Sequence, residues 1–231
     1  MSIRHIVSSF TEELEHLAAD ILRMGGIAET MINDACRAVV TSDQALAEEA
    51  AARDDRLDAL EVELERRIIR LLALRQPLAG DLRVVVAGLK VSSDLERIGD
   101  LSKNIAKRTS GLEAANIGSA LRGVEAMGQS VAAQLHSVLN AYSEDDAGLA
   151  LRVWTNDEEI DQHYNALFRE VLLDMREHPD RITAGAHLMF IAKNLERIGD
   201  HCTNIAEVVH YQVTGDHLSS KARPRAPLLD S

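Results

Sequence analysis

The sequence has few of the residues from which β-sheets and disulfide-stabilised folds are built. Phe, Trp and Tyr together make up only 3% of its 231 residues, and there are only 4 prolines and 2 cysteines. Aromatic and β-branched residues favour strands, whereas the Ala, Leu, Glu and Arg that dominate this chain favour helices. The composition therefore predicts an all-α fold.

Other features that the sequence lacks bear on its cellular location. Cys36 and Cys202 form no C-x-x-C pair and lie within helical patterns, so we expect buried thiols in a reducing compartment. The first 19 residues carry charges throughout and lack the apolar centre of a signal peptide. No apolar run reaches the length of a membrane span. These absences predict a cytoplasmic protein that reaches a membrane only through its partners.

The charge and the motif content exclude further classes. A net charge of −12 argues against non-specific binding to nucleic acid or to an anionic membrane surface. The sequence contains no P-loop, no G-x-G-x-x-G and no Ser/His/Asp set that its pattern would support. We therefore expect no nucleic-acid partner, no nucleotide chemistry and no enzymatic activity.

The chain contains an internal repeat. The six residues Leu-Glu-Arg-Ile-Gly-Asp occur at 95–100 and again at 195–200, and Asn-Ile-Ala follows at 104–106 and 204–206. Upstream, Met-Gly at 24–25 recurs 103 residues later. Such self-similarity is typical of one structural unit present twice.

Each repeat is predicted to contain three long helices. The expected ranges are 7–40, 43–75 and 79–109, then 114–142, 145–177 and 181–214. Ser42-Asp43 and Ser143-Glu144 offer N-caps for the middle helices, and Pro77 and Pro179 end them. Long helices joined by short loops pack antiparallel to their neighbours.

The predicted fold is two tandem antiparallel three-helix bundles. The first repeat would occupy residues 1–110, the second 111–215, and a disordered tail 216–231. The middle helix of the first repeat supports a bundle, because it carries a single apolar seam. The seam residues are Leu57, Leu60, Leu64, Ile68 and Leu71.

Each repeat carries two acidic pairs at i, i+4 spacing, which places both members of a pair on one helix face. The first acidic face comprises Asp54, Asp58, Glu96 and Asp100, and the second acidic face comprises Asp157, Asp161, Glu196 and Asp200. Like charges at this spacing repel and require a compensating cation or counter-charge. All-oxygen sites suit hard cations, iron or manganese rather than structural zinc. These residues are therefore the candidate metal ligands.

A solvated charged face is the ordinary explanation for one such pair. Two observations favour a site instead. The acids recur at all eight positions in register, and Asp157 and Asp161 share a helical stripe with apolar Tyr164. By the same helical projection, Glu96 and Asp100 point away from the main apolar seam of their helix. The site is therefore expected in a surface groove of the bundle.

Other metal-ligand patterns are weaker. Glu13-x-x-His16 and Glu207-x-x-His210 have the Glu-x-x-His spacing of di-iron bundles, but they fall at unmatched places in the two repeats. His201 follows Asp200, although its counterpart Leu101 is not a ligand. Arg97 and Arg197 are expected to neutralise the neighbouring acids.

With the doubled L-E-R-I-G-D…N-I-A signature and Asp-x-x-x-Asp on the preceding helices, the sequence resembles the PhoU family. The resemblance covers nearly the whole chain, to about Gly215. It implies paired three-helix bundles, with iron or zinc clusters on some members at the Glu/Asp-x-x-x-Asp motifs. It also implies a homodimer that represses the phosphate-starvation response through the ATPase subunit of the phosphate transporter and the phosphate-sensing histidine kinase.

Three alternatives stay open at this point. The protein is a non-enzymatic regulator carrying metal (Fe, Zn, Mn, Mg or Ca), a ferritin-like di-iron oxidase, or a metal-free helical scaffold. An oxidase needs Glu and Glu-x-x-His sets that face inward within one four-helix bundle, which the three-helix units disfavour.

Overall fold

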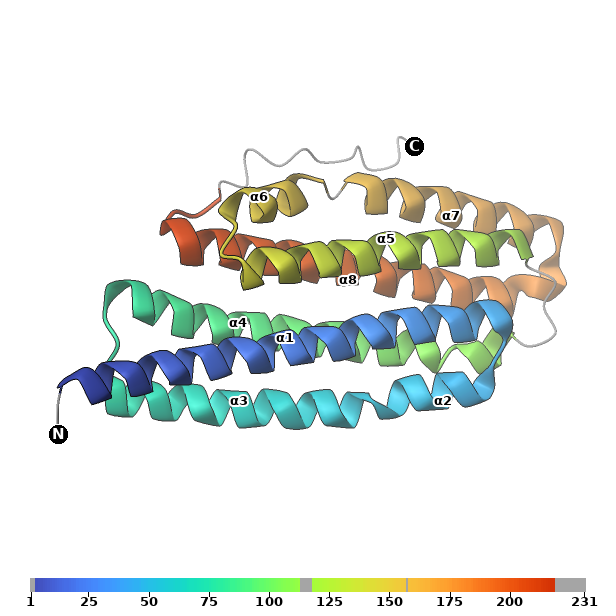
Figure 1. Ribbon diagram of the computed structural model, residues 1–231. Coiled ribbons are helices and arrows are strands. Elements are labelled where there is room, and N and C mark those ends of the chain that lie inside the picture. The colour runs from blue at the N-terminus through green and yellow to red at the C-terminus, as the bar shows by residue number, and fades with distance from the viewer. Residues whose placement is uncertain (1–2, 113–117, 157, 219–231) are drawn as a thin grey trace.

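The protein folds into two layers of antiparallel helices (Figure 1). The computed structural model describes residues 3–112, 118–156 and 158–218, and within these ranges it contains helices and no strand. The helices are α1 (Ile3–Thr41), α2 (Gln44–Ala52), α3 (Asp54–Arg75), α4 (Ala79–Ala106), α5 (Gly118–Ser143), α6 (Ala147–Thr155), α7 (Glu158–Glu177) and α8 (Ile182–Thr214), with 3-10 turns η1 (Thr109–Leu112) and η2 (Pro179–Arg181).

The layers correspond to the two repeats. In the first bundle α1 and α4 pack together and α2 and α3 cover their outer side, and α5 to α8 repeat this arrangement in the second bundle. The bundles meet through α1 on α5 and α4 on α8. The predicted all-α fold, with two tandem antiparallel three-helix bundles, is confirmed.

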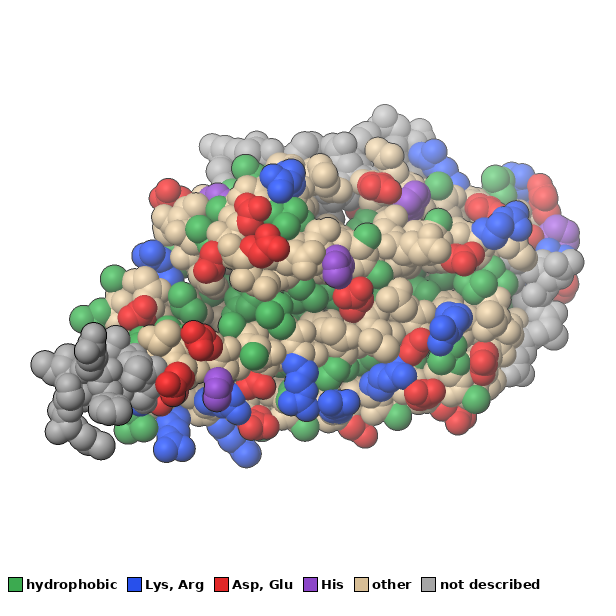
Figure 2. Space-filling model, viewed as in Figure 1, with side chains coloured by type: hydrophobic (Ala, Val, Ile, Leu, Met, Phe, Trp, Pro, Cys, Tyr) green, Lys and Arg blue, Asp and Glu red, His purple; other side chains and the backbone are tan. Residues whose placement is uncertain are grey.

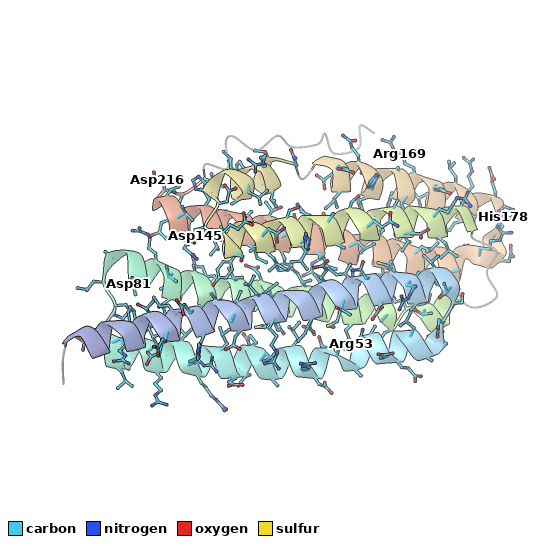
Figure 3. The ribbon with its side chains drawn as sticks, viewed as in Figure 1. Arg53, Asp81, Asp145, Arg169, His178 and Asp216 are labelled. Carbon is cyan, nitrogen blue, oxygen red and sulfur yellow. The ribbon has the colours of Figure 1, made fainter. Side chains whose placement is uncertain are left out.

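The prediction of an unbroken middle helix was wrong in both repeats. The first repeat has α2 and α3 separated at Arg53, and the second has α6 ending at Thr155 and α7 starting at Glu158. The backbone of Arg53 stays near helical, at φ −68° and ψ −20°, so the apolar periodicity continues across the break. No proline or glycine marks it. Figure 3 places Arg53 at this junction.

The caps of the middle helices are aspartates. The side chain of Asp43 accepts a hydrogen bond from the Leu46 amide at 3.0 Å, as the sequence indicated. In the second repeat the cap is Asp146, which accepts from the Leu149 amide at 2.9 Å, rather than the predicted Ser143-Glu144. Both carboxylates satisfy a backbone donor that the first helical turn leaves unpaired.

The predicted seam of α3 lies in the core. Leu57, Leu64, Ile68 and Leu71 are buried, and Leu60 packs partly buried against them. After the seam ends, Gln76 adopts a left-handed conformation (φ 47°) and Pro77 follows, so the chain leaves the helix as predicted. One face of α3 is thereby fixed against α1 and α4, which determines where its acidic residues point.

The repeated Met-Gly has a structural role at the contact between α1 and α5. A Cβ atom on Gly25 would lie 2.5 Å from a Cδ atom of Leu139, and one on Gly128 would lie 2.6 Å from Sγ of Cys36. Position 139 is the repeat counterpart of position 36, so the two contacts are related by a pseudo-two-fold axis. Both glycines therefore allow the two bundles to approach closely.

The remaining predictions about the chain concern its thiols and its end. Cys36 and Cys202 are buried and form no disulfide, and burial raises the pKa of the Cys36 thiol to about 12. The ring of His217 stacks on Tyr211 at 4.2 Å, within the segment predicted as tail. Residues 219–231 of that tail lie outside the described residues. Among the described helices, none combines the length and apolar character that crossing a lipid bilayer requires.

Candidate functional site: the acidic faces

The break between α2 and α3 positions Asp54. Asp54 is the first residue of α3, where a carboxylate is favoured by the positive end of the helix dipole. Its side chain is only 2% exposed, although no local pattern in the sequence indicated that this acid would be buried. One carboxylate oxygen, Oδ1, has no hydrogen-bond partner. A buried carboxylate in this state requires a nearby cation.

The other three acids of the first acidic face lie around Asp54. Asp58 stands one turn further along α3, and Glu96 and Asp100 lie on α4, which packs against α3. Burial raises the pKa of Asp58, and the charges of Asp54 and Asp100 add to this effect. Burial also raises the pKa of Glu96, with smaller contributions from Asp100 and Asp58. The two predicted pairs therefore lie close together on the neighbouring helices α3 and α4 and repel.

The ammonium group of Lys103 joins the two helices at the first acidic face. Lys103 Nζ donates to Oδ1 of Asp100 at 2.8 Å and also to Oδ2 of Asp54. The lysine side chain is 24% exposed, and these two hydrogen bonds raise its pKa, so it carries its charge at neutral pH. Lys103 is thus the counter-charge that the buried Asp54 requires.

A second cation, Arg97, lies at the exposed side of the first acidic face. The Arg97 guanidinium is 3.4 Å from Glu96 and 3.5 Å from Asp100, and its side chain is mostly exposed. Exposed ion pairs of this kind contribute little to stability. The prediction that Arg97 neutralises the neighbouring acids is confirmed.

The second acidic face is described only in part, because Asp157 lies outside the described residues. Asp161 on α7 and Glu196 on α8 are partly buried, and Asp200 is exposed. Lys193 lies 2.6 Å from Glu196, with its side chain 51% exposed. The position equivalent to Lys103 is held by Thr203, whose hydroxyl donates to the Gly199 carbonyl at 3.0 Å.

The first acidic face does not fit a metal ion in this arrangement. Its four acids are all described, yet nowhere in the described ranges do three or more His, Cys, Asp or Glu side chains form a group that could hold a metal. The ammonium of Lys103 contacts both helices between which a metal would bind. The metal-ligand assignment of the eight acids stays a prediction.

The weaker candidate ligands have other partners. Glu13 forms two hydrogen bonds with the Arg75 guanidinium, at 2.7 and 3.3 Å, which hold the pKa of Glu13 below its usual value. His201 lies 2.8 Å from Asp94 on α4, so it links the two bundles. Neither arrangement supports the Glu-x-x-His set of a di-iron oxidase.

Sequence reasoning missed two cations of the site, Lys103 and Lys193. Each is three residues from a motif acid, Lys103 after Asp100 and Lys193 before Glu196, and this spacing places the side chains on one helix face. That spacing could have identified them. The contact between Lys103 and Asp54, 49 residues apart, depends on helix packing and had no local signal.

The raised carboxyl pKa values predict a pH-dependent stability. The usual values are 3.8 for Asp58 and 4.5 for Glu96, and both are raised in the folded protein. A carboxyl group whose pKa rises on folding makes its full contribution to the stability of the folded protein at pH values below its unfolded-state pKa. This contribution is lost as the pH rises through the folded-state pKa.

We therefore expect Asp58→Asn with Glu96→Gln to raise the free energy of unfolding by about 0.5 kcal/mol at pH 7, since it removes like-charge repulsion. The gain should shrink as the pH falls through the folded-state pKa values and be lost well below the usual values of 3.8 and 4.5, where the wild-type groups are protonated in both states. Urea titrations in chelator at both pH values measure this difference. A double variant less stable than wild type at pH 7 would show that these acids hold the fold through attractive contacts.

The fold and its acidic faces define a class: duplicated three-helix-bundle proteins with two surface groups of carboxylates. Comparison with known proteins also finds one domain present twice in the chain. The PhoU domain matches residues 21–109 and 124–209. The chain therefore belongs to the PhoU family.

Curated relatives and solved structures match along most of their length. The phosphate-specific transport system accessory protein PhoU homolog of Caulobacter vibrioides is 52% identical over 226 residues, covering 97% of this chain and 98% of the relative. The homolog of Rhizobium meliloti is 45% identical, with 93% and 91% covered. The crystal structure of PhoU from Pseudomonas aeruginosa superimposes with a TM-score of 0.84 at 35% identity, covering 90% of this chain and all of that one. The phosphate transport system regulatory protein PhoU of Streptococcus pneumoniae gives a TM-score of 0.85 at 30% identity, with 91% and 99% covered.

Proposed function

We propose that this protein is an accessory regulator of high-affinity phosphate transport that represses the phosphate-starvation response when phosphate is plentiful. The observation that carries the proposal is the end-to-end match, at 52% identity, to a relative named as an accessory protein of this transport system. The absence of any nucleotide-binding motif from the sequence supports a role without phosphoryl transfer. The protein would act by binding other proteins rather than by catalysis.

The proposed partners are the ATPase subunit of the phosphate transporter and the phosphate-sensing histidine kinase. The protein would bind both partners at the cytoplasmic side of the membrane. Helices of up to 39 residues form long, rigid faces, and the repeat provides two related ones. The outer face in Figure 2 carries interspersed acidic and basic side chains over α3, which suits polar, reversible docking. A homodimer remains part of the proposal.

Metal binding is also part of the proposal. The acidic faces supply the Asp and Glu oxygen ligands that suit a hard divalent or ferric ion, and at the first face such an ion would have to displace the ammonium of Lys103. Its role would be structural or modulatory, and the family resemblance together with the eight registered acids supports it.

Deletion of the gene tests the regulatory role. We expect phosphate-starvation genes to remain expressed in phosphate-rich medium, since the link between transporter and kinase would be missing. A transcriptional reporter for these genes measures the effect, with the transporter intact and the wild-type gene returned on a plasmid as the control. Normal repression in the deletion strain would refute the proposal.

A further inference from the structure

Within the repeated signature the two repeats differ only at the three residues that follow the acidic motif, 101–103 and 201–203, and the last of these changes the charge. Position 103 is lysine in the first repeat, and its counterpart, position 203, is threonine. The second repeat has a lysine of its own at 193, where the first has Ser93. The two lysines are not equivalent, because Lys193 is half exposed and pairs with the single acid Glu196.

Lys103 occupies the position that a bridging cation would take. Its ammonium contacts the carboxylates of Asp54 on α3 and Asp100 on α4, so one positive charge joins both helices of the first acidic face. A metal ion coordinated by this face would have to make the same connection. The ammonium of Lys103 has three N–H donors, so it can donate to both carboxylates at the same time.

One oxygen of the Asp54 carboxylate is left without a partner at the first acidic face. Asp54 is buried, and its Oδ1 has no hydrogen-bond partner while Oδ2 accepts from Lys103. A buried carboxylate oxygen without a hydrogen-bond partner is already removed from solvent, which lowers the desolvation cost of binding a metal ion. Removing the ammonium would leave this oxygen and its neighbours open to a metal.

We propose that Lys103 is the built-in cation of the first acidic face and excludes divalent metal from it. The inference rests on the proposed metal role of the acidic faces and restricts it. The first face is held by its own ammonium whether or not metal is present, and it becomes a metal site only when that ammonium is removed.

The test uses Mn²⁺, which suits carboxylate ligands and whose free hydrated ion gives a quantifiable EPR signal. The background protein carries Asp161→Asn and Asp200→Asn, which removes carboxylates of the second face and leaves the first face as the binding site measured. Lys103→Thr is introduced because the second repeat itself has threonine there. Lys103→Met removes the charge at similar length, and Lys103→Arg keeps the charge.

We expect the Thr and Met variants to bind Mn²⁺ at least about tenfold more tightly than the background protein, and the Arg variant to match the background. Adding Asp58→Asn to the Thr variant should abolish the gain, which assigns it to the first face. Circular dichroism in chelator confirms that each variant is folded.

Two results would overturn the inference. One is a background protein, with Lys103 in place, that binds Mn²⁺ and loses it on Asp58→Asn with Glu96→Gln. This measurement needs no change at position 103, so it decides the matter even if Lys103 variants fail to fold. The other is a folded Thr or Met variant with no gain in affinity. Neither result would alter the expected derepression of the starvation genes on deletion, so the regulatory proposal is tested separately.

Discussion

Replacing Lys103 with methionine is expected to lower the free energy of unfolding by about 3 kcal/mol in chelator at neutral pH. The variant removes the ammonium that pairs with Asp54, whose side chain is 2% exposed. Breaking a buried ion pair by removing one partner leaves the other charge without compensation, and this is far more destabilising than the pair is stabilising. Urea or thermal unfolding, followed by circular dichroism, measures the difference.

A matched double variant separates lost pairing from lost packing. Asp54→Leu combined with Lys103→Met replaces both charged groups by apolar ones, and we expect it to recover most of the lost stability. Lys103→Arg should stay close to wild type because it keeps the charge. If Lys103→Met were as stable as wild type, Asp54 would not depend on this lysine, and the assignment of Lys103 as its counter-charge would be wrong.

Substituting Gly25 by valine is expected to cost about 2–3 kcal/mol, whereas the same substitution at Gly26 should have little effect. The residues are adjacent in α1, so helix propensity changes equally at both positions. Gly25 is buried, and its added Cβ would lie 2.5 and 2.6 Å from the Cδ atoms of Leu139 on α5. Gly26 is exposed, and nothing lies within 4 Å of the equivalent point.

The difference between these two variants isolates the contact between the bundles. Denaturant titration of both gives the difference in unfolding free energy, and Gly128→Val should resemble Gly25→Val because Cys36 lies at the corresponding place. Equal losses at positions 25 and 26 would mean that α1 and α5 can move apart freely, contrary to the packing described.

The larger features of the fold could be predicted from the sequence because they depend on repeated local patterns. The periodic apolar positions predicted the helices, and Pro77 marked the end of the first middle helix. The register of the acids in the two repeats correctly predicted that Asp58 and Glu96 lie on helices that pack against each other.

What could not be predicted depends on contacts between distant residues. The break at Arg53 leaves the periodicity intact, and it involves a guanidinium that reaches Asp34 on α1, 19 residues away. The burial of Asp54 follows from that break. Local patterns also placed the start of the second middle helix too early, since Asp146 could not be told from its acidic neighbours Glu144 and Asp145 as the cap.

The paired glycine contacts also bear on how the chain originated. In a one-repeat ancestor, the face around Met-Gly would have met a second copy of itself across an isologous dimer axis, so any change there would have occurred twice. Duplication and fusion made the two contacts separate. One partner of the glycines is now Leu139 and the other is Cys36, so the same structural position has diverged on the two sides of the axis while both glycines remain. Within one polypeptide, α1 and α5 thus meet as the two copies of an isologous dimer would, with different side chains on the two sides of the axis.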